Sequence, residues 1–130
     1  MNSLQEICGS FISKHPECIY SYKKNIPPVC LQDVSIRLPL KQVIELINYF
    51  GEYAWCLNID MSGNKNVSNK NLIMLGNIHT LNLERCENIT DVSALGNVHI
   101  LNLSRCYNIT DVSALGNVHT LDLSCLYVII

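Results

Sequence analysis

Three kinds of residue capable of chemistry recur at a spacing of twenty positions in the second half of this 130-residue chain. Imidazoles or thiols stacked at this spacing could bind a metal ion, and paired carboxylates could act as acid and base. Any residue that recurs once per repeat also forms a row when repeats stack, whatever its chemistry. We therefore predict structural rows, with no metal, no cofactor and no enzyme activity. The rows are His79, His99 and His119; Cys86 and Cys106; and Asp91 and Asp111.

The repeat that carries these rows is written out twice, as NITDVSALGNVH at 88–99 and again at 108–119. After each copy, leucines alternate with polar residues, and the same alternation occurs twice earlier in the chain. Alternation with a period of two is typical of a half-buried strand. We predict four strands, one per repeat, whose inward residues are Leu57, Ile59 and Met61, then Leu81 and Leu83, Leu101 and Leu103, and Leu121 and Leu123.

Short outer turns are predicted to connect the strands. In the last copy, Asp111 can cap a helical turn, Val112 to Leu115, that Gly116 ends. The earlier segment from Ser68 to Leu75 is two residues longer, and we expect it to form a proper helical turn. The apolar residues of a single repeat are too few to enclose a core, so the repeats must stack on one another.

The first half of the chain has helical spacing instead. Apolar residues predict helices at 3–14, 17–24 and 39–50, and the last of these is framed by Pro39 and Gly51. We therefore divide the chain into an N-terminal helical cap region, 1–54, and a repeat region, 55–130, of about three repeats and an incomplete last one.

The phrase from Val98 to Asp111, with the pattern LxxLxLxxCxxITD, resembles the cysteine-containing leucine-rich repeat. Ile78 to Asp91 fits the same pattern, and Leu57 to Val67 fits it loosely, with Gly63 in place of the cysteine. The resemblance implies an α/β leucine-rich repeat solenoid with a short parallel sheet on its concave face, where ligands are held.

Carried onto this chain, the outward strand positions are candidates for binding a partner. Their side chains are small, polar and mildly acidic, which favours a protein or peptide with basic or hydrogen-bonding groups. They are Asn58, Asp60, Ser62, Thr80, Asn82, Glu84, Ile100, Asn102, Ser104, Thr120, Asp122 and Ser124.

Composition limits the classes of partner and the cellular compartment that we expect. The net charge is −2 and the charges are spread singly, so we expect no nucleic acid partner. No apolar run approaches the roughly 20 residues of a membrane span, and the N-terminus lacks the pattern of a signal peptide. We predict a cytoplasmic protein with free, buried thiols, whose function is non-enzymatic protein–protein interaction.

Two other functions stay open. Leu38 and Pro39, followed by an apolar helix, are similar to the opening of an F-box, which implies a substrate adaptor of a ubiquitin ligase; however, the segment from Gly51 to Trp55 runs almost directly into the first strand. Alternatively, the apolar end from Leu126 to Ile130 suggests a truncated, non-functional array. An exposed last strand would also favour self-association.

Overall fold

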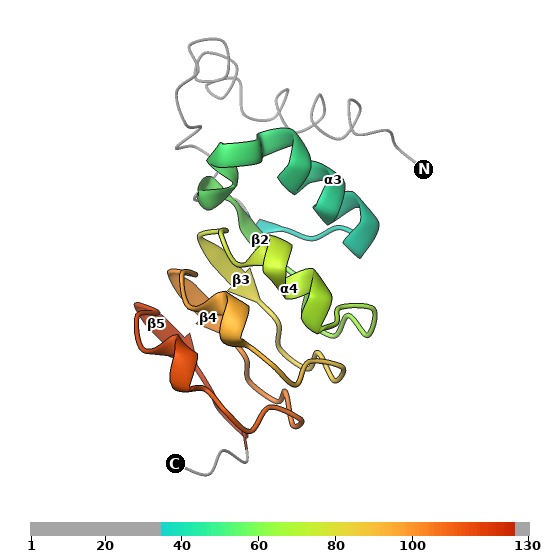
Figure 1. Cartoon of the computed structure of the whole chain (residues 1–130). Coiled ribbons are helices and arrows are strands. Elements are labelled where there is room, and N and C mark those ends of the chain that lie inside the picture. The colour runs from blue at the N-terminus through green and yellow to red at the C-terminus, as the bar shows by residue number, and fades with distance from the viewer. Residues whose placement is uncertain (1–34, 127–130) are drawn as a thin grey trace.

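The computed structural model describes residues 35–126, apart from the side chains of Glu52, Tyr53 and Cys56 (Figure 1). It is an α/β structure with a parallel sheet of five strands in chain order. The strands are β1 (Ser35–Ile36), β2 (Asn58–Asp60), β3 (Thr80–Asn82), β4 (Ile100–Asn102) and β5 (Thr120–Asp122). The helices are α3 (Leu40–Phe50) and α4 (Asn69–Leu75), and three 3-10 helices span Gly51–Cys56, Ser93–Leu95 and Ser113–Leu115.

Each repeat pairs with the next in a constant register. Leu81 lies beside Leu101, and Leu101 beside Leu121, so identical positions of successive copies face one another. The predicted α/β class and the four predicted strands are confirmed. Each strand is three residues long, shorter than the predicted alternation, because the chain turns directly after Asp60, Asn82, Asn102 and Asp122.

A fifth strand, β1, lies in the N-terminal cap region, between the helices predicted at 17–24 and 39–50. Ser35 and Ile36 pair with Asn58 and Ile59 of β2. Two residues are too few to display a period, which is why the sequence did not reveal this strand. A 3-10 helix continues from α3 to Cys56 before β2 begins.

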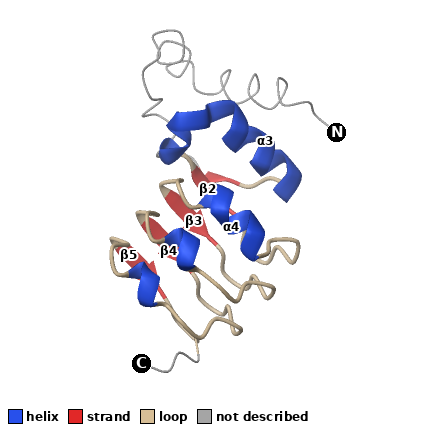
Figure 2. Cartoon of the chain, in the orientation of Figure 1, coloured by secondary structure: helices blue, strands red, loops and turns tan. Residues whose placement is uncertain are grey.

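The helices lie on one face of the sheet (Figure 2). α3 confirms the predicted helix at 39–50, with Pro39 at its N-cap and Gly51 ending it at a φ of 55°. Its buried residues are Val43, Leu46 and Ile47. Leu40 and Ile44 are only partly buried.

α4 confirms the helical turn expected in the longer repeat. It begins after Ser68, whose N–H donates to the Asn71 side-chain oxygen at 2.9 Å. A second bond joins the Ser68 hydroxyl to the same oxygen at 3.0 Å. The Ser68 side chain also faces the backbone N–H of Asn71, which completes a capping box. A capping box satisfies backbone donors that the first turn leaves unpaired.

The core runs through the stacked leucines and weakens toward β5. Leu81, Leu83, Leu101 and Leu103 are at most 1% exposed. Their counterparts in the last repeat, Leu121 and Leu123, are only partly buried. The sheet therefore has an apolar end face at β5 within the described part of the chain.

Some expectations fall outside residues 35–126. The helices predicted at 3–14 and 17–24 and the segment 127–130 are among the residues that the structure does not describe. Within the described range, no helix is both long enough and apolar enough to cross a membrane.

Candidate binding surface

Eight of the predicted binding residues lie on the strands and form two rows across the sheet. Register places the members of each row directly beside one another. Ile100, Thr120 and Asp122 are exposed, and the other five are partly buried. The first row is Asn58, Thr80, Ile100 and Thr120, and the second is Asp60, Asn82, Asn102 and Asp122.

The remaining predicted positions do not belong to the strands. Glu84, Ser104 and Ser124 lie in the turns that follow the strands, as does Ser62. Ser104 is only 7% exposed, so little of its surface is accessible to a partner. The alternation of the sequence cannot reveal this, because the turn rotates the chain immediately after the third strand residue.

The second row shapes these turns. The backbone N–H of Glu84 donates to the Asn82 side-chain oxygen at 2.9 Å, and Ser104 donates to Asn102 at 2.8 Å. Asp60 and Asp122 accept the equivalent bonds, each at 2.9 Å. A side chain that accepts a backbone N–H two residues later forms an Asx turn. The row therefore has a structural role whether or not it also contacts a partner.

Each turn ends in a residue with left-handed backbone geometry. The φ angles are 71° at Gly63, 60° at Arg85 and Arg105, and 64° at Cys125. A hydrogen bond from Cys86 N–H to the Leu83 oxygen, 3.0 Å long, closes one of these turns. Positive φ at the third turn position favours glycine, and a residue with a Cβ there costs about 1 kcal/mol.

This alignment corrects one sequence assignment. The N–H of Gly63 donates to Glu84 just as the N–H of Arg85 donates to Ser104. Gly63 is therefore the counterpart of Arg85, and Asn64 occupies the cysteine position.

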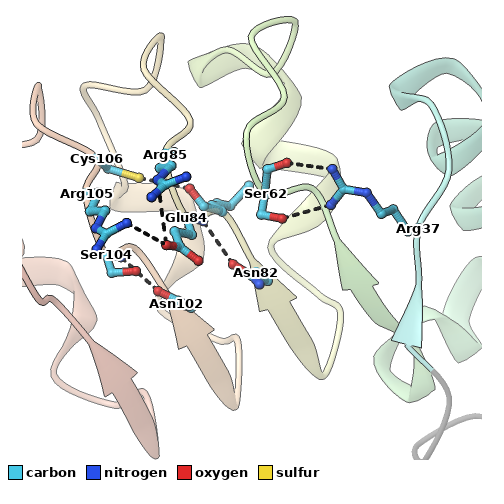
Figure 3. A network of polar contacts seen from close by, with 10 residues as sticks. Arg37, Ser62, Asn82, Glu84, Arg85, Asn102, Ser104, Arg105 and Cys106 are labelled. Carbon is cyan, nitrogen blue, oxygen red and sulfur yellow. Dashed lines mark hydrogen bonds and ion pairs between the residues drawn. The ribbon is translucent and has the colours of Figure 1, made fainter.

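Arginines flank two of the acidic groups on this surface, and Figure 3 shows one of them, Glu84, beside Arg85 and Arg105. Arg37 lies 3.1 Å from the Asp60 carboxylate and also donates to the Ser62 hydroxyl at 2.8 Å. The Glu84 carboxylate lies 3.9 Å from Arg85 and 3.8 Å from Arg105. Exposed pairs of this kind contribute about 0–1 kcal/mol. They nevertheless change the chemistry of the surface, because the predicted acidic character is largely matched by positive charge.

The three arginines were missed as surface residues. Arg85 and Arg105 carry a visible signal, because they recur directly before the two repeated cysteines. Arg37 carries none, because its proximity to Asp60 depends on the pairing of β1 with β2.

The cysteine row is confirmed as a pair of buried free thiols. The Cys86 thiol donates to the Met61 oxygen at 3.1 Å, and the Cys106 thiol donates to the Leu83 oxygen at 2.9 Å. Burial raises the pKa of Cys86 to about 11 and also raises the pKa of Cys106. Both thiols stay protonated near neutral pH and join successive repeats.

The aspartate row caps the outer turns, as predicted. Asp91 accepts the Ser93 N–H at 2.9 Å, and Asp111 accepts the Ser113 N–H at the same distance. These bonds lower the pKa of both carboxyl groups. No group of three or more metal-binding side chains occurs within the described residues.

Comparison with known proteins identifies no relative. No protein-family model, curated protein or solved structure matches the chain. The residues and their geometry are therefore the basis for any proposal about function.

The histidine row is a stack of rings. Ring centroids lie 4.8 Å apart between His79 and His99 and 4.6 Å apart between His99 and His119. The last two rings are nearly parallel, at 6°. Burial lowers the pKa of His79, and the adjacent His99 lowers it further. Folding therefore favours the neutral form of His79.

This stack predicts a loss of stability in mild acid. Below the ordinary histidine pKa of 6.5, the unfolded chain binds a proton at this position more readily than the folded chain. The contribution of His79 to the free energy of unfolding should be constant above neutral pH and should fall as pH decreases through 6.5. Urea denaturation between pH 7.5 and 5 would measure this change in the free energy of unfolding. His79→Gln should flatten this dependence, and an unchanged slope in that variant would contradict the assignment.

Proposed function

We propose that the chain is a leucine-rich repeat solenoid that acts as a non-enzymatic protein-binding module. The partner would lie on the face of the sheet opposite α3 and α4. Support for the repeat architecture comes from the register, because leucines at one repeat position stack from β3 to β5, buried in β3 and β4 and partly buried in β5. Each added repeat extends both the core and the surface in the same direction.

The observation that carries the binding proposal is the uncovered face of the sheet. Parallel sheets are normally covered on both faces. Within residues 35–126, the helices lie on one face only (Figure 2). On the other face, Ile100 is 36% exposed and lies in register between Thr80 and Thr120. An apolar side chain flanked by hydroxyl groups suits the surface of another protein better than it suits water.

Selection of displayed peptides on the full chain would test this proposal. Selected peptides should bind the native protein, and Ile100→Asp should weaken their binding about tenfold or more. Ile73→Asp is the matched control, because Ile73 is 71% exposed on α4, in the helical layer. Both variants should keep the melting temperature of the native protein. Equal binding by the native protein and both variants, or equal loss in both variants, would reject the strand face as the site.

The other two functions remain predictions from the sequence. A single α-helix, α3, lies between Pro39 and β2 in the described chain, and it is followed by the 3-10 helix Gly51–Cys56. This arrangement gives the adaptor hypothesis no further support. Self-association through β5 is addressed by the second prediction in the Discussion.

A further inference from the structure

Arg85 and Arg105 occupy a backbone position that disfavours them. Both have a φ of 60°. The same position is occupied by glycine at residue 63 in the first repeat and by Cys125, with a φ of 64°, in the last. The example of Gly63 indicates that the turn forms without a side chain there. Residues kept in a left-handed conformation cluster at functional sites, where the side chain has a use that offsets the backbone strain.

The fold itself makes little use of these two side chains. They are 61% and 42% exposed, and their contacts with Glu84 are longer than a charge-assisted hydrogen bond. Within residues 35–126, neither guanidinium forms another ion pair. The core passes beneath them, through Cys86 and Cys106. We therefore look for a role of these two side chains in contacts with another molecule.

The two guanidinium groups lie at the same carboxylate oxygen. Glu84 Oε1 is 3.9 Å from Arg85 Nε and 3.8 Å from Arg105 Nη1 (Figure 3). Each guanidinium has five N–H donors, so most donors of both groups are not directed to Glu84. A carboxylate is the group that this pair already approaches, and the planar fork of arginine suits two-point binding of further carboxylates.

We propose that Arg85 and Arg105 form a recognition site for an acidic segment of a protein partner. Aspartate or glutamate side chains of that segment bind the outward donors of the two arginines, alongside Glu84. The inference rests on the proposed function as a binding module and adds the chemistry of the partner. It also reverses the expectation of a basic partner, because the repeated turns present arginine beside the strand face.

The test uses a fluorescent ten-residue peptide of alternating glutamate and glycine, titrated into the full chain at low salt. The combined variant Arg85→Gln with Arg105→Gln should weaken binding about tenfold. Lys41→Gln with Lys70→Gln removes the same charge from exposed positions on α3 and α4 and should leave affinity within about twofold. A peptide with glutamine in place of glutamate should not bind.

A second variant separates the side chains from the turn. Arg85→Gly with Arg105→Gly should lose peptide binding and raise the melting temperature, because glycine adopts positive φ without strain. A lower melting temperature in this variant would overturn the argument from strain.

Four binding results would overturn the inference. They are no binding of the glutamate peptide, equal loss in the lysine control, full binding by the glutamine variant, and tighter binding of a matched phosphoserine peptide. None of them alters the comparison of Ile100→Asp with Ile73→Asp, so the proposed function stands or falls separately.

Discussion

Replacing Gly76 with alanine is expected to lower the free energy of unfolding by about 2–3 kcal/mol. A Cβ at this position would lie 2.3 Å from the backbone oxygen of Ala94, in the outer turn of the next repeat. Backbone atoms cannot move aside as a flexible side chain can, so the two repeats would have to separate. Gly96→Ala should have a smaller effect of the same sign, because its Cβ would lie 2.8 Å from the Ala114 oxygen.

Gly116→Ala is the internal control for this series. Gly116 occupies the same repeat position, but among residues 35–126 no atom beyond its own chain neighbours lies within 4 Å of its Cβ site, and its φ of −61° is ordinary for alanine. The free energy of unfolding should be unchanged or higher by up to about 1 kcal/mol. Urea unfolding of the three variants would give the order of their free energies of unfolding. If Gly116→Ala were as destabilising as Gly96→Ala, another surface would have to pack against this position.

The second large effect is expected for leucines at a single repeat position. Leu103→Ala should lower the free energy of unfolding by about 2–4 kcal/mol, because Leu103 is fully buried between neighbouring repeats and its removal leaves a cavity. Leu123 has the same repeat position but is only partly buried at the end of the stack. Leu123→Ala should cost about 1 kcal/mol.

Urea unfolding at low and high protein concentration would measure this difference, with size-exclusion chromatography as a parallel reading. A monomer should show the unequal losses at both concentrations. Equal losses that depend on protein concentration would contradict the prediction and would mean that a second molecule covers β5. The comparison therefore tests the expected self-association as well as the core.

The rows of repeated residues stabilise the fold and are distinct from the positions that could bind a partner. The cysteines, aspartates and strand-end asparagines bond to the backbone, so their recurrence has a structural cause. Positions where the copies differ are better candidates for recognition. Thr80, Ile100 and Thr120 share one row on the uncovered face, and only the middle one is apolar.

The sequence by itself determined strands β2 to β5, the two described α-helices and the capping of the turns. Alternation of leucine with polar residues, the Pro39 start and the Asp91 cap all depend on residues close together in the chain. Such interactions are the same in every copy, so a period of twenty residues displays them directly. The buried state of Cys86 and Cys106 followed from the same reasoning, because a residue inside one repeat lies inside all stacked repeats.

Only the tertiary structure decided how one repeat meets the next. The strand β1, the Arg37 pair with Asp60 and the burial of Ser104 depend on contacts between segments twenty or more residues apart, or on the turn that reorients the chain. The glycines illustrate the physical reason. Gly76 and Gly96 have ordinary helical φ angles, and they are required by the approach of the next backbone and not by their own conformation. The local sequence pattern determined the fold of each repeat. Steric fit between neighbouring repeats determined which residues lie on the surface.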